Sequence, residues 1–297
     1  MRRTIVANHP KTEQRRQRER PQTEGAQSIN RAFGALRIVA AHGDRGAALK
    51  EVTIESGLHR ATAYRILSAL VDEGVLEFDE PTRRYRLGVE IFALGASMGE
   101  RFDVRNLARP SMKELCESTR DTVYLGVRSG YDGLCVDMQE GNYPIKTLRL
   151  HAHDRWPLGV GAFTIPLLAW LSDNEVKEIV AHNARRLEGE REHTPVSILA
   201  RVVETRQRNY AVNYIRTYPG MCGIGVPILD QRNRPIASLC VVALIRRMDE
   251  KRQVRIAASL WAASRRIAAL WKSVRQVGAR DEHWKAQSTA GETRRSA

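Results

Sequence analysis

Apolar residues recur at intervals of three and four along the first third of the chain, and this spacing predicts three helices. The first begins after Ser28, a favourable N-cap residue, and continues to Gly43. The second covers residues 49–56 and ends at Gly57, and the third follows at once within residues 57–74. Two short helices joined by so tight a turn form a helix-turn-helix.

The third helix has two different faces. The apolar face predicts burial and consists of Ala63, Ile66, Leu67 and Leu70. The other face carries Arg60, Thr62, Tyr64 and Arg65. The segment that follows alternates apolar and polar residues around a turn at residues 79–82, which predicts a hairpin. We expect its inward residues to be Leu76, Phe78, Tyr85 and Leu87, and its tip to carry Arg83 and Arg84.

Three helices and a basic hairpin in this order predict a winged helix-turn-helix DNA-binding domain over residues 28–88. We expect Arg60 and Arg65 to contact guanine edges or phosphates, and Thr62 to contact a phosphate. Tyr64 would reach a phosphate or a thymine methyl group, and the two wing arginines would follow the DNA backbone. In the alternative interpretation the two helix arginines are merely solvated and Tyr64 covers the core.

Residues 89–103 continue as a connecting helix with an apolar stripe that has no obvious partner in the small domain. The stripe consists of Ile91, Leu94, Met98 and Phe102. We expect it to contact a second copy of the chain, because two-fold dimers are common and match palindromic operators. The alternative partner is the second domain of the same chain.

Beyond residue 104 the pattern changes to alternating strands and helices, which predicts a second domain of the α/β class over residues 104–276. Expected strands cover 122–128, 133–139, 145–150, 223–229 and 235–244. Expected helices cover 161–171, 173–181 and 195–208, the last capped by Thr194, and a final helix begins at Asp249. We expect a mixed sheet with helices on its faces.

The formal net charge of +14 favours a polyanionic partner, with nucleic acid ahead of an anionic membrane. Residues 1–27 are basic and nearly free of apolar side chains, so we expect a disordered arm, and residues 277–297 read as a loose tail. The longest apolar stretch, residues 159–171, is too short to span a bilayer, and the first residues lack the apolar run of a signal peptide. A cytoplasmic protein that does not bind membranes is expected.

Catalytic and metal chemistry find little support in the sequence. The four cysteines lack CxxC spacing, so neither disulfides nor a zinc site is expected. His151 and His153, with Asp154, could ligate a metal from a strand, but exposed loop histidines are commoner. Because no nucleophile, P-loop or dinucleotide motif stands in its required context, we expect no cofactor, no metal and no enzyme activity.

The sequence resembles the IclR family of bacterial transcriptional regulators over about residues 28–275. The residues that carry the likeness are LKEVTIESGLHRATAYRILSALVDEGVLEFDEPTRRYRLGVEIFALG, WPLGVGAFTIPLLAWL and YAVNYIRTYPGMCGIGVPILDQRNRPIASLCVVA. The resemblance implies a DNA-binding domain, a linker helix and a GAF-like α/β domain that binds a small effector, commonly an organic or aromatic acid.

The resemblance also implies an effector pocket lined by Ala162, Phe163, Asn213, Gly223, Cys240 and Val242. Several of these depart from the family pattern: Asn213 stands where acids are frequent, Phe163 replaces a small residue, and Cys240 and Val242 replace hydroxyls. These changes predict an effector other than a short keto acid, or weak binding. We therefore expect an effector-responsive, operator-binding regulator that self-associates as a dimer or tetramer. The alternatives are an effector-independent architectural DNA binder and, further away, an enzyme with a DNA-tethering module.

Overall fold

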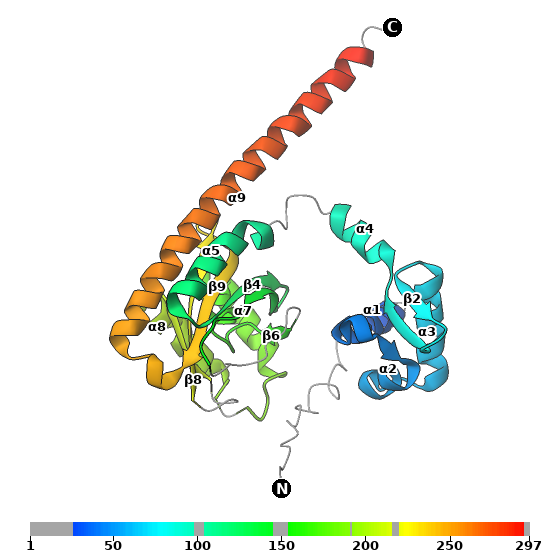
Figure 1. Ribbon diagram of the computed structural model, residues 1–297, viewed down its shortest axis with the longest axis horizontal. Coiled ribbons are helices and arrows are strands. Elements are labelled where there is room, and N and C mark those ends of the chain that lie inside the picture. The colour runs from blue at the N-terminus through cyan, green and yellow to red at the C-terminus, as the bar shows by residue number, and fades with distance from the viewer. Residues whose placement is uncertain (1–25, 98–103, 145–153, 191, 216–219, 294–297) are drawn as a thin grey trace. The chain divides into compact units, whose positions relative to one another are not determined.

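The computed structural model describes residues 26–97, 104–144, 154–190, 192–215 and 220–293, with side chains as far as residue 274. The chain forms two compact units that divide between residues 99 and 100, and Figure 1 shows their elements. Each unit has its own buried core.

The N-terminal unit combines helices with a small antiparallel sheet. Its elements are α1 (Ala26–Ala41), β1 (Ala47–Ala48), α2 (Leu49–Ser56), α3 (Arg60–Asp72), β2 (Leu76–Asp79), β3 (Arg84–Leu87) and α4 (Val89–Ser97), and its strand order is β1-β3-β2. The core includes Val39 from α1, Val52 from α2, Leu67 from α3 and Tyr85 from the hairpin. This is the predicted winged helix-turn-helix.

Local details of this unit partly match the sequence patterns. Gly57 ends α2 with φ of 66°, a left-handed conformation that favours glycine, as predicted. The prediction that Ser28 caps α1 is wrong, because α1 begins at Ala26, where alanine and glutamine extend the helix. Leu87 was also predicted to be buried, yet it is 42% exposed because it ends β3 beyond the core. The two-residue strand β1 was not predicted.

The C-terminal unit is a six-stranded sheet with helices on both faces. Its elements are α5 (Val104–Thr119), β4 (Thr122–Ser129), β5 (Asp132–Gln139), β6 (Arg155–Pro157), α6 (Thr164–Ala169), α7 (Asp173–Ala184), α8 (Pro195–Arg208), β7 (Ala211–Ile215), β8 (Met221–Leu229), β9 (Pro235–Leu244) and α9 (Glu250–Thr293). The strand order is β6-β5-β4-β9-β8-β7, and each of these neighbouring pairs is antiparallel.

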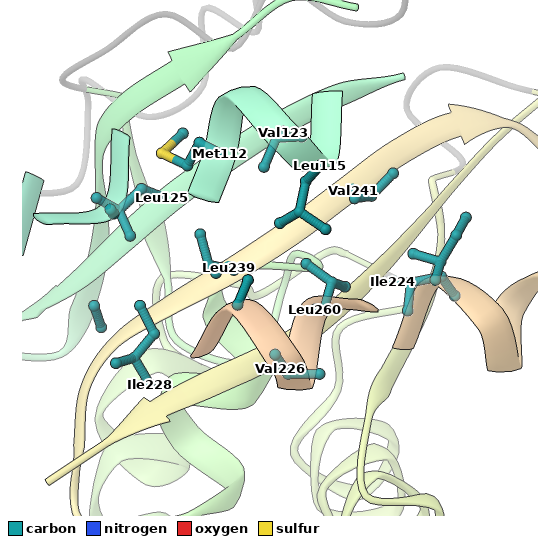
Figure 2. Close-up of a cluster of buried hydrophobic side chains, with 14 of the residues drawn as sticks. Met112, Leu115, Val123, Leu125, Ile224, Val226, Ile228, Leu239, Val241 and Leu260 are labelled. Atoms are coloured by element: carbon teal, nitrogen blue, oxygen red, sulfur yellow. The ribbon is translucent and has the colours of Figure 1, made fainter. Parts of the chain in front are cut away.

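Two helices cover one face of this sheet. Figure 2 shows Met112 and Leu115 of α5 and Leu260 of α9 among the valines, leucines and isoleucines of β4, β8 and β9. Side chains alternate between faces along a strand, so the intervening residues point to the opposite face, where α6 lies. The helices α6, α7 and α8 share a further apolar cluster. The helix α9 continues well beyond the sheet (Figure 1).

The α/β fold class is confirmed, with several corrections. The prediction of a mixed sheet is wrong, because short connections such as residues 130–131 and 230–234 join neighbouring strands as antiparallel hairpins. The loose tail predicted at 277–297 is wrong as far as Thr293, where α9 ends, because no proline interrupts this stretch. The elements α5 and β6 were not predicted, and the expected strand at 145–150 lies outside the described residues.

The cap predicted for α8 is confirmed. Thr194 Oγ1 accepts a hydrogen bond from Ser197 N at 3.2 Å, and Pro195 occupies the first turn. The helix predicted at 161–171 is shorter, since α6 is regular only from Thr164 to Ala169. The 3-10 helix Ile245–Arg247 leads from β9 toward α9.

Candidate DNA-binding and effector sites

A groove of about 750 Å³ lies where α2, α3 and the hairpin of the N-terminal unit converge. Its lining residues are Ala48, Leu49, Lys50, His59, Arg60, Ala61, Tyr64, Phe78, Arg83 and Tyr85. Among these described residues there are three Lys and Arg side chains and no carboxylate, so the groove is suited to an anionic partner.

The structure brings three of the predicted DNA-binding residues to this groove. Arg60 and Tyr64 come from the first turns of α3, and Arg83 comes from the hairpin turn. Thr62 and Arg65 also belong to α3 but do not line the groove; Thr62 is half-buried and Arg65 is exposed. The prediction that α3 has one buried and one exposed face is confirmed for these residues: Ala63 and Leu67 are fully buried, whereas Tyr64 is 56% exposed.

Arg84 was predicted to lie at the wing tip, but it contacts the body of the unit. Its Nη1 donates to Gly46 O at 2.8 Å and to Glu51 Oε2 at 2.9 Å. Glu51 also accepts from the backbone N–H of Ala48 at 2.8 Å, and this bond, together with Arg45 and Arg84, lowers the pKa of the Glu51 carboxyl group. Arg84 thus ties the hairpin to the start of α2.

Arg83 has a different environment at the turn between β2 and β3. Its φ of 56° places the residue in the left-handed region, and its guanidinium lies 5.4 Å from the centre of the Phe78 ring. The ion pair with Glu80 joins two side chains that are about three-quarters exposed, so it holds Arg83 only weakly. Arg83 therefore remains accessible to a partner in the groove.

Sequence reasoning missed Lys50 and His59, which line the same groove. Lys50 is the second residue of α2, and His59 immediately precedes α3. Both could have been found from the helix-turn-helix geometry, because the first helix of the motif crosses the DNA backbone and the N-terminal residues of the second contact base edges. Their side chains add donors to the ones that the sequence singled out.

The connecting helix α4 exposes apolar side chains. None of its residues is buried within the described unit; Phe92 is 78% and Leu94 54% exposed, and Ile91 is half-buried. Met98 and Phe102, the other two members of the predicted stripe, lie outside the described residues. Ile29 and Phe33 of α1 are also more than half exposed. The unit therefore carries apolar surface that its own core does not use.

The predicted effector residues gather on the sheet face that α6 covers. Ala162, Phe163, Cys240 and Val242 belong to one buried cluster, together with Tyr124 and Cys135. Asn213 lies directly opposite Gly223 across the β7–β8 pair, and Gly223 lies opposite Val242 across the β8–β9 pair. All six positions named by the family resemblance thus belong to one region of the unit.

This region is closely packed, and two glycines permit the packing. A Cβ atom on Gly223 would lie 2.4 Å from the Cβ of Ala162, and one on Gly126 would lie 2.4 Å from Cδ2 of Phe163. Ser238 Oγ donates to Phe163 O at 2.6 Å and holds the start of α6 on the sheet. The Phe163 ring, 2% exposed, therefore fills space beside the sheet as a core side chain does.

Burial keeps the ionisable groups of this cluster neutral. It raises the pKa of the Cys135 thiol to about 12 and also raises the pKa values of Cys240 and Tyr124. These thiols are therefore poor nucleophiles at neutral pH.

Two other expectations concern metals and membranes. Over the part of the chain that the structure describes, no three His, Cys, Asp or Glu side chains gather as a metal site requires. His151 and His153 lie outside that part. No helix within the described ranges is long and apolar enough to cross a membrane.

Two protein-family models match the chain. The model for the C-terminal domain of the bacterial transcriptional regulator IclR matches residues 96–269, and the model for the IclR helix-turn-helix domain matches residues 28–80. The chain is 27% identical over 207 residues to the HTH-type transcriptional regulator KipR of Bacillus subtilis, covering 69% of this chain and 81% of KipR. It is 26% identical over 251 residues to the regulator KdgR of Escherichia coli, covering 84% and 94% of the two chains.

Solved structures share the fold. An IclR-type regulator from Alicyclobacillus acidocaldarius has a TM-score of 0.67 at 21% identity, covering 84% of this chain and 99% of that chain. An IclR homologue from Microbacterium hydrocarbonoxydans, complexed with 4-hydroxybenzoate, has a TM-score of 0.65 at 21% identity, covering 83% and 99%. The first family model alone spans more than half of the chain. The chain therefore belongs to the IclR family of DNA-binding transcriptional regulators.

Proposed function

We propose that the chain reads its operator through the groove formed by α2, α3 and the wing. The observation that carries the proposal is the convergence of Lys50, Arg60 and Arg83 on one carboxylate-free surface. A recognition helix enters the major groove by its N-terminal turns, so Arg60 and Arg65 would reach base edges, with Tyr64 beside them. Thr62, Lys50 and Arg83 would contact phosphates.

Arg84 has a different role in this proposal. Its two hydrogen bonds to Gly46 and Glu51 favour a residue that positions the wing, rather than one that contacts DNA. The net charge of +14 adds a long-range attraction to any duplex.

The test is operator binding as a function of salt. Selection of bound fragments from genomic DNA would identify the operator, and titration at several salt concentrations would count the phosphates contacted. The logarithm of the affinity should fall with the logarithm of salt concentration, with a slope of about −0.9 per neutralised phosphate. If the selected operator were bound no more tightly than unselected DNA, this result would contradict sequence-specific recognition.

Self-association through α4 is the second part of the proposal. An exposed apolar helix next to a DNA-binding domain is well placed to pair with its copy and so present two recognition helices to a palindromic site. Ile91 and Leu94, with Met98 and Phe102, would form the contact.

The third part is regulation by a small organic or aromatic acid at the α6-covered face of the sheet. The residues concerned are Ala162, Phe163, Asn213, Gly223, Cys240 and Val242. A protein of the same fold is known in complex with 4-hydroxybenzoate, which makes aromatic acids reasonable first probes for this chain.

A second candidate function is DNA binding without an effector. The close packing of Ala162 and Phe163 over the sheet glycines favours it. Thermal shift with a metabolite panel, followed by operator binding with each hit, would separate the two candidates. If the chain chemically converted a metabolite that it binds, the result would instead favour an enzyme with a DNA-tethering module.

A further inference from the structure

Most of the positive charge of this chain lies in the C-terminal unit. Residues 26–99 hold nine Lys and Arg and nine Asp and Glu, so the winged helix-turn-helix and its connecting helix have no net charge. Residues 100–297 hold 32 Lys and Arg against 22 Asp and Glu, an excess of ten, and residues 1–25 supply the other four of the total of +14. Operator binding by the N-terminal unit therefore leaves most of this charge without a role.

The helix α9 has a basic side that faces solvent. Residues 251–274 include six Lys and Arg and no Asp or Glu. The opposite side of the helix packs on the sheet through buried residues such as Leu260 and Ile267. The solvent side consists of two rows whose members recur every seven residues, because two helical turns return to nearly the same direction. These rows are Lys251, Ala258, Arg265 and Lys272, all exposed, and Arg255, Ala262 and Ala269, of which only Ala262 is half-buried.

Four cations on this side form what we call the basic stripe: Lys251, Arg255, Arg265 and Lys272. None of the four has a carboxylate partner among the residues that the structure describes. The arginines beside them differ, because Arg252 Nη2 lies 2.8 Å from Asp121 Oδ2 and Arg266 Nη2 lies 2.5 Å from Glu114 Oε2. The fold thus uses the neighbouring arginines but leaves the charges of the basic stripe available to a partner.

The dimensions of the basic stripe fit a long polyanion. Lys251 and Lys272 are 21 residues apart, which corresponds to about 30 Å along a straight helix. Phosphates recur about every 3.4 Å along each strand of a duplex, so this length matches about nine base pairs. The side chains between the cations are short alanines, which allow a phosphate backbone to approach the helix closely. Double-stranded DNA therefore matches the stripe in charge, length and shape.

Two other partners fit less well. A helix that lies on a membrane inserts large apolar side chains into the lipid, whereas the leucine and isoleucine side chains at 260 and 267 of α9 pack against the sheet. A second copy of α9 would place like charges opposite one another, which disfavours pairing through this side. Duplex DNA is the partner that the observations favour.

We propose that the basic stripe of α9 is a second DNA-binding surface, which contacts the phosphates of double-stranded DNA without reading its sequence. The inference goes beyond the proposed function, because operator recognition through the groove uses residues of the N-terminal unit alone. Lys and Arg contacts to phosphate oxygens carry no sequence information by themselves. They would hold the chain on DNA of any sequence while its recognition helix searches for the operator.

Binding of the full chain to a duplex without an operator tests the stripe. The stripe variant combines four substitutions: Lys251→Gln, Arg255→Gln, Arg265→Gln and Lys272→Gln. Because glutamine favours helices and all four positions are exposed, this variant should keep the wild-type melting temperature. Its affinity should fall about tenfold or more at moderate salt. The slope of log affinity against log salt should become shallower by about 2 to 4, because each lost phosphate contact removes about 0.9.

A charge-matched control separates local contacts from net charge. It combines four substitutions at exposed positions of the same unit, on α7 and in the connection between β8 and β9: Lys177→Gln, Arg185→Gln, Arg232→Gln and Arg234→Gln. This control should weaken binding by no more than about threefold, because it changes only the long-range field. An equal loss in the control and the stripe variant, or no loss in the stripe variant, would overturn the inference.

Lysine acetylation tests the same surface in the unaltered chain. A bound duplex without an operator should protect Lys251 and Lys272 from acetic anhydride, measured by mass spectrometry, whereas Lys177 on α7 should stay reactive. Equal reactivity of all three lysines with and without DNA would contradict the proposal. This measurement does not depend on the folding of any variant.

Poly-glutamate and phosphatidylserine vesicles, used in place of the duplex, test the class of partner. If the stripe variant lost binding to either of these but bound DNA as the wild-type chain does, the assignment to DNA would be overturned. Operator preference is measured separately. If the wild-type chain showed no such preference while the stripe variant still bound DNA more weakly, the proposed function would fail and the inference would stand. If the wild-type chain preferred its operator but the stripe variant bound other DNA normally, only the inference would fail.

Discussion

The two candidate sites of this chain differ in how their residues relate to the core. In the N-terminal unit, Arg60, Tyr64 and Arg83 surround an open groove, while Ala63 and Leu67 of the same helix hold the fold. In the C-terminal unit the candidate residues are themselves core, with exposures between 0 and 8% for the five that carry side chains. Function and stability are therefore separable in the first unit and combined in the second.

The largest expected effect follows from this difference. Phe163→Ala should cost the C-terminal unit about 3–5 kcal/mol, because the ring fills a slot above Gly126 that cannot fully collapse. All five tryptophans belong to this unit, so urea unfolding followed by tryptophan fluorescence reports its stability.

Tyr64→Ala is the matched removal of an aromatic ring in the other unit. Since Tyr64 is 56% exposed, this variant should change stability by only about 0.5 kcal/mol, measured by circular dichroism, while it weakens operator binding. The comparison between the two sites would fail if Tyr64→Ala were the more destabilising variant.

A second prediction concerns the exposed apolar surface of α4. Leu94→Glu should abolish self-association, because an unpaired charge buried at an interface costs about 3–5 kcal/mol. Each unit should nevertheless stay folded, because Leu94 is exposed within its own unit. Light scattering measures the mass directly. The control is Ala96→Glu, an exposed position two residues after Leu94 and therefore on the opposite side of the helix. If both variants keep the wild-type mass, α4 is not the interface.

The N-terminal unit was predictable because its signals are local. Helical spacing around Ala63 and Leu67, the glycine that ends α2 and the turn after Asp79 each act within a few residues. What the sequence could not reveal was the partner of Arg84, since Gly46 and Glu51 lie more than 30 residues away in the chain. Its inward orientation depends on tertiary contacts, to which local patterns are blind.

The effector face was much harder to derive from the residues alone. Cys240 and Val242 lie in an apolar strand that reads as ordinary core, and only the family resemblance singled them out. The close approach of Phe163 to Gly126 joins two segments 37 residues apart, so no periodicity reports it. The α5 helix was not predicted; Pro110 lies in its interior, where a proline lacks the N–H group that the helical hydrogen bond requires.

The third prediction sharpens the roles of the arginines on α3 and on the wing. Arg60→Ala or Arg65→Ala should cost about 1–3 kcal/mol and relax operator preference at particular base pairs. Arg83→Ala should instead weaken all sequences about equally and reduce the salt slope by about one. Binding to a panel of operator point variants distinguishes these outcomes. If Arg83→Ala changed the preferred sequence while the helix variants did not, the roles of helix and wing would be reversed.

The smallest expected effect concerns Arg84 and depends on pH. The Ala48 N–H, with Arg45 and Arg84, lowers the pKa of Glu51 from its ordinary value of 4.5. The ionised carboxylate therefore stabilises the folded state above pH 4.5, and this contribution is lost as the pH falls through the lowered pKa. Arg84→Gln should cost no more than about 1 kcal/mol at pH 7, because both side chains keep a quarter or more of their surface exposed. The difference from wild type should shrink at pH 3.

Denaturant unfolding of the wild-type chain and of Arg84→Gln at pH 7 and at pH 3 measures this difference in stability. The salt dependence of operator binding tests whether Arg84 also contacts DNA. A residue that only positions the wing leaves the salt slope unchanged, whereas loss of a phosphate contact lowers it by about one. Glu51→Gln serves as the control, since it removes the other half of the ion pair without removing a cation from the DNA-binding surface. A reduced slope in Arg84→Gln with an unchanged slope in Glu51→Gln would return Arg84 to the set of DNA-contacting residues.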